Sequence, residues 1–219
     1  MPSRIVRLGT DINMEKYIFK VTKPYIRESI IALITDAFWG LFVYLVAVVC
    51  FHEYVLALWV FAPFALMAVV FDMPLMVKCL LDRKKQIVIE KTGTYVDIYH
   101  DFSLSNKLSR QSDSVLTTWY YPKEWNMQRV KPAFETAEGK MFKPRCVLSY
   151  AHDQDSVFMN IRGIQQNADN PILLRVQYCK YSKALLSIRM VSYPPDMKRR
   201  TKDYIDSSLR DILRWTVKV

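Results

Sequence analysis

Two apolar runs, IIALITDAFWGLFVYLVAVVCF (residues 30–51) and YVLALWVFAPFALMAVVFDMPLMV (residues 54–77), decide how this chain is organised. Only His52 and Glu53 separate them. A helix rises about 1.5 Å per residue and needs about 20 apolar residues to cross the hydrocarbon core of a membrane. Each run is long enough, and neither has the continuous polar face of a helix at the surface of a soluble core. We therefore predict a transmembrane helical hairpin over residues 30–81.

The basic residues on either side of the hairpin predict its orientation. Lys and Arg occur before the first run and after the second, whereas the short connection between the runs contains neither. The positive-inside rule places such flanks on the cytoplasmic side of a membrane. We therefore expect a membrane protein that crosses the bilayer twice and has both termini in the cytoplasm. The flanking residues are Lys16, Lys20, Lys23, Arg27, Lys78, Arg83, Lys84 and Lys85.

Each apolar run contains one acidic residue, Asp36 in the first and Asp72 in the second. A carboxylate inside a membrane is costly and by default indicates function, so a subunit of an oligomeric channel or transporter would use this pair. The alternative, favoured by their depth, is that both lie at the headgroup boundary and pair with Arg27 or Lys78. Pro63 is expected to kink the second helix, because proline removes a backbone donor.

Residues 1–29 form a juxtamembrane segment that mixes basic and apolar side chains. Pro24 discourages a helix from running straight through this segment. Residues 17–21 have a β-branched and aromatic bias that is typical of strands. Two alternatives stay open: an interfacial segment on the leaflet, which we favour slightly, and a short strand added to the sheet of the following domain.

Residues 82–219 are predicted to form a separate cytoplasmic domain, because the apolar pattern changes there to a period of two. Strand patterns at residues 86–90 and 95–99 flank Gly93 and predict a β-hairpin. Residues 123–144 form either a long functional loop or an edge hairpin around Glu138 and Gly139. Further strands are predicted at residues 114–121, 145–150, 156–161, 173–178 and 184–191.

The inward faces of two elements in this domain can also be predicted. In the strand at residues 173–178, Leu174, Val176 and Tyr178 should face the core. After Pro195 the apolar period becomes helical, so an amphipathic helix is expected to end the chain and cover one side of the sheet. Its predicted apolar face consists of Met197, Tyr204, Ile205, Leu209, Ile212 and Leu213.

A helical hairpin followed by an antiparallel sheet and one terminal helix is an α+β arrangement. The number and order of the strands resemble a pleckstrin-homology-like barrel, a fold that bacterial membrane proteins also attach to paired transmembrane helices. The resemblance concerns the architecture alone. No residue motif carries it, and it implies no site residue.

The residues needed for common catalytic and metal centres are scarce. The 219 residues include 5 Gly, 4 Cys and 3 His. No two glycines are close enough for a phosphate-binding loop, and no Cys-x-x-Cys pair exists. We predict no metal site, no cofactor and no enzymatic activity. An enzyme would have to use the local polar groups His152, Asp153 and Asp155, or Glu135 with Glu138.

The charge of the chain indicates what the domain contacts. The net charge is +10, and nearly all of it lies in residues 82–219. Basic residues near a cytoplasmic leaflet are attracted to anionic lipid headgroups by about 1 kcal/mol each. Nucleic acid is attracted by the same charge, but we give it little weight for a domain beside a membrane. The predicted lipid contacts are Lys78, Arg83, Lys84, Lys85, Lys198, Arg199, Arg200 and Lys202.

For the last four of these residues, a solvated helix face is an equally good interpretation. The overall prediction is an integral membrane protein that holds a basic interaction or regulatory domain at the inner face of the membrane. There it would bind another membrane or cytoplasmic protein, a second copy of itself, or anionic lipid. The mechanism would be tethering, which raises the local concentration of the domain near its partners.

Overall fold

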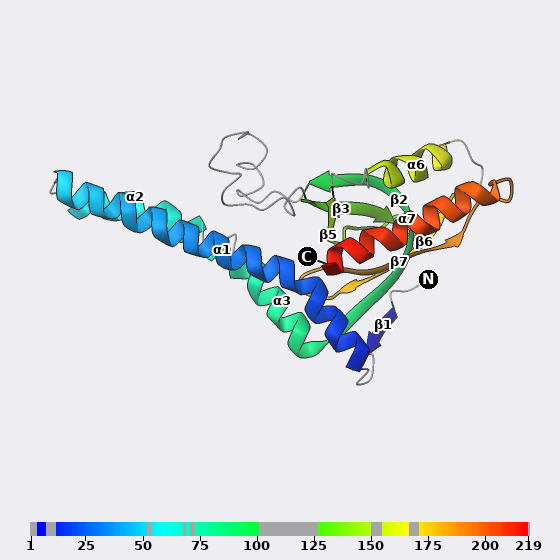
Figure 1. Cartoon of the computed structure of the whole chain (residues 1–219), viewed down its shortest axis with the longest axis horizontal. Helices are drawn as coiled ribbons and strands as arrows, with labels where there is room; N and C mark the ends of the chain where they lie inside the picture. The colour runs from blue at the N-terminus through cyan, green and yellow to red at the C-terminus, as the bar shows by residue number, and fades with distance from the viewer. Residues whose placement is uncertain are drawn as a thin grey trace.

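The computed structural model describes residues 4–7, 12–51, 54–67, 69–70, 73–100, 127–149, 155–166 and 171–218. Figure 1 shows a long helical arm that projects from a curled sheet with helices on one side. The elements are β1 (Arg4–Arg7), α1 (Ile12–Phe51), α2 (Tyr54–Met67), α3 (Met73–Lys85), β2 (Ile87–His100), β3 (Met127–Glu135), β4 (Met141–Phe142), β5 (Cys146–Ser149), α6 (Asp155–Gln166), β6 (Leu173–Cys179), β7 (Leu185–Ser192) and α7 (Arg199–Lys218).

The arm consists of the outer part of α1 with α2 lying beside it (Figure 1). Within α1, residues Glu15–Cys50 form the one helix in the described part of the chain that is long and apolar enough to cross a membrane, and its most apolar 18 residues have a mean hydropathy of 2.1. The second apolar run is divided between α2, which has 14 residues, and α3. Pro74 lies in the first turn of α3, where proline favours the start of a new helix. The structure thus shows one helix of membrane-spanning length where we predicted two.

The predictions for Pro24 and Pro63 have different outcomes. The prediction that Pro24 would interrupt a helix is wrong, because α1 runs through it. Figure 1 shows that α1 changes direction in its dark blue first third, and Ile18, Val21 and Tyr25 in that third are buried against the domain. This packing stabilises the helix on both sides of the proline, which bends it instead of ending it. α2 continues through Pro63 to Met67, and the predicted kink at Pro63 stays a prediction.

The strand at residues 17–21, the less favoured of the two alternatives, is wrong, because these residues belong to α1. The juxtamembrane segment does contribute a strand to the sheet, but from residues closer to its beginning. β1 pairs antiparallel with β2, with Arg4 opposite Glu90 and Arg7 opposite Ile87. Residues 17–21 form a helix and not a strand because a helix places Ile18 and Val21 on the same buried face.

The sheet is antiparallel with the strand order β4-β3-β2-β6-β7, and β1 and β5 pair with β2 and β3. It curls until the start of β5 meets the start of β7: the Arg145 N–H donates to Lys183 O at 2.7 Å, and the Leu185 N–H donates to Arg145 O at 2.8 Å. In the described residues this contact is an isolated bridge, and α7 packs against both β5 and β7. The α+β class is confirmed, whereas a closed, pleckstrin-homology-like barrel is not.

The predicted hairpin at Gly93 is wrong, since residues 87–100 form the single strand β2. A Cβ atom at Gly93 would lie 2.6 Å from the backbone oxygen of Glu135. Gly93 therefore serves the close approach of β3 to β2 instead of a turn. The edge hairpin around Glu138 and Gly139 is confirmed as the β3–β4 connection, where Gly139 has a φ of 74°.

The strand predicted at residues 156–161 is wrong, because these residues lie in the helix α6. Phe158 and Ile161 are both buried, and side chains three apart share a face only on a helix. The strands predicted at residues 145–150, 173–178 and 184–191 are confirmed as β5, β6 and β7. The strand predicted at residues 114–121 lies outside the described residues.

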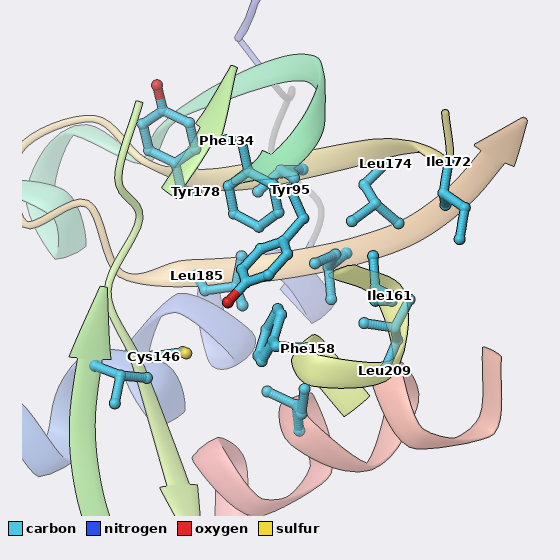
Figure 2. Close-up of a cluster of buried hydrophobic side chains, with 14 of the residues drawn as sticks. Tyr95, Phe134, Cys146, Phe158, Ile161, Ile172, Leu174, Tyr178, Leu185 and Leu209 are labelled. Atoms are coloured by element: carbon cyan, nitrogen blue, oxygen red, sulfur yellow. The ribbon is translucent and has the colours of Figure 1, made fainter. Parts of the chain in front are cut away.

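The main hydrophobic core lies between the sheet and the two helices α6 and α7. Figure 2 shows its side chains, in which the rings of Tyr95 and Phe158 join the two layers with centroids 5.1 Å apart. Leu174, Val176 and Tyr178 are buried, as predicted. On α7 the prediction is confirmed for Ile205, Leu209 and Ile212, which are buried, and for Met197 just before the helix, which packs against the core. It is wrong for Tyr204, which is 46% exposed, and the side chain of Leu213 lies outside the described residues.

Candidate functional site

A second, smaller core joins the helical arm to the sheet domain, and we call it the junction. α1 contributes three side chains to it, α3 contributes one, and the strands β2, β6 and β7 with their connection supply the rest. Because these elements bury one another, the arm and the domain form one packed unit. The buried residues of the junction are Ile18, Val21, Tyr25, Cys79, Val88, Cys179, Ala184 and Leu186.

Asp82 lies at the centre of the junction and is 1% exposed. Its Oδ1 accepts a hydrogen bond from the backbone N–H of Tyr181 at 2.9 Å, and its Oδ2 accepts one from the N–H of Ser182 at 2.7 Å. A buried carboxylate is stable when backbone donors satisfy both of its oxygens. Asp82 therefore fastens α3 to the turn between β6 and β7.

Arg83 fastens α3 to α1 on the neighbouring side of the junction. Its Nε donates to Thr22 Oγ1 at 2.9 Å, and its guanidinium lies 3.9 Å from the centre of the Phe19 ring. One further N–H donates to the backbone oxygen of Phe19 at 3.2 Å. Such planar stacking and branched donation suit Arg and not Lys. Arg83 was predicted to contact lipid; its side chain is partly buried and contacts Thr22 and Phe19, and the lipid contact stays a prediction.

The connection between α3 and β2 is a single residue, Gln86. Its N–H donates to Asp82 O at 2.8 Å, and its φ is 50°. This is the left-handed end of a helix that glycine usually provides. The connection is too short to let the domain turn freely against the arm, which argues against a loose tether.

The two buried cysteines of the junction are structural. Burial and the nearby charge of Asp82 raise the pKa of the Cys179 thiol well above its ordinary value. A thiol that stays protonated is a poor nucleophile and a poor metal ligand. In the described ranges, no group of three or more His, Cys, Asp or Glu side chains is arranged to hold a metal ion.

The predicted basic residues separate into two groups at opposite ends of the domain. Lys78, Lys84 and Lys85 are exposed on α3, next to the arm. The other group begins α7, which Figure 1 places at the end of the domain away from α2. The structure therefore does not bring the two groups to one surface. The second group is Lys198, Arg199, Arg200 and Lys202, of which Lys202 donates to Tyr193 Oη at 2.7 Å.

The predicted acidic residues do not form a described site. Asp36 is partly buried on α1, whereas Asp72 lies outside the described residues, so their proximity stays a prediction. Glu138 is exposed and pairs with Lys140 at 3.3 Å in the β3–β4 turn, and Glu135 is exposed where that turn begins. His152 and Asp153 lie outside the described residues, and Asp155 is the first residue of α6.

Sequence reasoning missed the residues that fasten the junction. From the sequence, residue 82 was placed only at the start of the predicted domain, because the partners of Asp82 lie about a hundred positions later in the chain. Thr22 and Ser182 give no recognisable pattern in the sequence. An acidic residue directly beside a basic run at a helix end was the one available indication. No protein-family model, curated protein or solved structure matches this chain.

Proposed function

We propose that this protein is an integral membrane anchor that holds its basic domain in a fixed orientation at the cytoplasmic face of the membrane, where the domain binds a partner protein. The observation that carries the proposal is the difference between the two ends of α1. One face of its first third is buried in the junction, whereas only 11% of its most apolar window is buried inside the protein. One helix thus enters both the domain and, on this proposal, the bilayer.

The exposed apolar surface of the arm supports insertion into a bilayer. Large side chains such as Ile34, Val49 and Trp59 are exposed, Trp59 to 74%. A continuous apolar surface of this kind on a protein marks a contact with membrane or with another protein. The apolar side chains occur around α1 and along α2 without a polar face, which favours lipid as the surrounding medium.

The path of α2 supports two crossings of the membrane. α2 returns beside α1 (Figure 1), so the segments before α1 and after α3 lie at the same end of the arm. The exposed Lys78, Lys84 and Lys85 are at that end, and the positive-inside rule assigns it to the cytoplasm. In this position the three lysines contact anionic headgroups, each contributing about 1 kcal/mol.

The junction changes the mechanism that we expected from the sequence. A flexible tether would raise only the local concentration of the domain. With Gln86 as the whole connection and Asp82 and Arg83 fastening three elements, the domain also keeps one orientation. A partner on the same membrane then meets the same surface of the domain at each encounter, so less orientational freedom is lost on binding.

Thiol labelling with a membrane-impermeant maleimide tests the proposed topology. Cys50 near the tip of the arm is exposed, and the other three cysteines are buried. In intact cells that express the full chain, Cys50 should be labelled from outside. A variant that combines Cys50→Ser with Glu138→Cys carries its reactive thiol on the domain, and it should be labelled only after the membrane is permeabilised.

Three results would contradict this topology. Labelling of the Glu138→Cys variant in intact cells would mean that the domain lies outside the cell and that the orientation of the arm is inverted. Failure of Cys50 to react before permeabilisation would place the tip of the arm inside. Recovery of the full chain in the soluble fraction would remove the membrane from the proposal altogether.

A further inference from the structure

A groove of about 700 Å³ lies between α6 and the start of α7. Its lining includes the apolar side chains of Met159, Ile164, Met197 and Tyr204. Met159 is 58% exposed and Tyr204 is 46% exposed. The core-facing sides of these helices are occupied by residues such as Phe158 and Ile205. Ile164 and Met197 also pack against that core, so the exposed apolar part of this lining is formed by Met159 and Tyr204. Large apolar side chains that stay in solvent beside a hollow indicate a docking surface.

Gly163 makes the floor of this groove deeper. It lies inside α6, where glycine destabilises a helix by about 1 kcal/mol relative to alanine. Apart from its chain neighbours and the nearby backbone of α6 itself, a Cβ atom at this position would have no heavy atom within 4 Å. Packing within the chain therefore does not require glycine here. The absence of a side chain instead leaves room for a group that enters from outside.

The rim of the groove is predominantly basic. Lys198 and Arg200 line it and are exposed, and Asp196 is the acidic residue among its lining. The neighbouring Arg199 pairs with Asp203 at 3.9 Å. Lys and Arg beside an apolar floor complement a ligand that combines apolar side chains with carboxylates. Methionine and tyrosine suit such a floor, since methionine adapts its shape and tyrosine is frequent at binding hot spots.

The position of the groove indicates where its ligand comes from. Figure 1 shows α6 and the start of α7 at the end of the domain away from the helical arm. Headgroups of the membrane that holds the arm cannot reach this end while the junction keeps the domain in place. The ligand therefore comes from the aqueous side, and a groove between two helices is a common site for an amphipathic helix.

We propose that the groove between α6 and α7 binds an acidic amphipathic segment of a partner protein. Apolar side chains of that segment occupy the floor over Gly163, and its Asp or Glu residues face Lys198 and Arg200. This inference deepens the proposed function by naming the chemistry of the partner. It depends on the proposed function for one point alone: the arm faces the bilayer and the groove does not.

Selection from a displayed library of random peptides tests the proposal. The target is the full chain in phosphatidylcholine nanodiscs, and empty nanodiscs remove peptides that bind lipid. The enriched peptides should be amphipathic and acidic. Gly163→Leu fills the floor and should weaken their binding by about tenfold or more, measured by fluorescence anisotropy. Gly163→Ala is the matched control: it makes the same backbone change with little added volume and should bind the peptides as the original chain does.

A second variant tests the charge. Lys198→Glu combined with Arg200→Glu should weaken acidic peptides by about tenfold or more and should favour basic peptides in a new selection. Circular dichroism of each variant confirms that the helices are retained. The proposal is overturned if the selection yields no enrichment or basic peptides, or if acidic peptides bind Gly163→Leu unchanged. The thiol labelling reports on which side of the membrane Cys50 and residue 138 lie and does not depend on the groove, so a failure there is distinguishable from a failure of the groove.

Discussion

Replacing Asp82 tests whether the arm and the sheet domain act as one unit. In the original chain, the backbone N–H groups of Tyr181 and Ser182 donate to Asp82 at 2.9 and 2.7 Å. In Asp82→Ala, both groups lose their acceptors. A buried donor without an acceptor costs about 1–3 kcal/mol. Ser182 is buried and Tyr181 is half-buried, so we expect the free energy of opening at this turn to fall by about 2–4 kcal/mol.

Asp82→Asn should have an intermediate effect. The amide oxygen of asparagine can accept one of the two hydrogen bonds, whereas its NH₂ group would face the second donor. About half of the loss is therefore expected, roughly 1–2 kcal/mol. An intermediate value would show that the two hydrogen bonds, and not the volume of the side chain, stabilise the junction.

Hydrogen exchange followed by mass spectrometry measures this opening in the full chain in detergent micelles. Since each 1.4 kcal/mol corresponds to a factor of ten, the amides of Tyr181 and Ser182 should exchange about 30 to 700 times faster in Asp82→Ala. Asp203→Ala is the control, because this exposed carboxylate forms only a surface ion pair at 3.9 Å and should change stability by less than about 0.5 kcal/mol. If Asp82→Ala exchanges no faster than Asp203→Ala, the junction does not fasten the domain to the arm.

Three further predictions concern single residues. Gly93→Ala should lower the free energy of unfolding by about 1–3 kcal/mol, because its Cβ would lie 2.6 Å from Glu135 O. Gly163→Ala should instead raise the free energy of unfolding by about 1 kcal/mol. Urea titration measures both, and equal effects would contradict the close packing of β3 against Gly93. Gln86→Gly should stabilise the α3 end by about 1 kcal/mol, since its φ is 50°, and a lower melting temperature would refute this. Because burial raises the pKa of the Cys179 thiol in the folded chain, this thiol loses its proton at a lower pH in the unfolded chain than in the folded one. Stability should thus fall as the pH rises past about 8.5, and Cys179→Ala should reduce that slope by up to about 1.4 kcal/mol per pH unit in urea titrations.

On the proposed function, the fastened junction affects how a partner protein would meet the domain. A domain on a flexible linker samples many orientations, and a partner must wait for the productive one. Here Gln86 is the whole connection between α3 and β2, and the buried turn at Ser182 is bound to Asp82. With the arm in a membrane, as we propose, a change in its tilt would therefore move the groove at the far end of the domain.

The elements that the sequence predicted correctly are those with a strong local pattern. β6 alternates Leu174, Val176 and Tyr178 inward, and α7 repeats Ile205, Leu209 and Ile212 at a helical period, so side-chain spacing alone indicates which face is buried. The long apolar run before His52 is likewise a local property, because it needs only enough residues to form a helix of membrane-spanning length.

The predictions that failed depended on distant partners. Gly93 resembled a turn residue, yet its role is set by the backbone of Glu135 on another strand. Residues 156–161 are short and apolar enough for either a strand or a helix, and packing of Phe158 on the ring of Tyr95 decided for the helix. The start of α1 resembled a strand or an interfacial segment until its contacts with β7 were known.

By itself the sequence determined that this chain has an apolar helical part and an α+β domain, because hydrophobic periodicity is a local property of the chain. Only the tertiary structure decided that the two parts are fastened together by Asp82 and that a groove with a glycine floor lies at the far end. Both features join residues that are separated in the chain, by a hundred positions between Asp82 and Ser182. Hydrogen bonds and hollows of this kind depend on how elements pack in space, and they cannot be predicted from the spacing of residues along the chain.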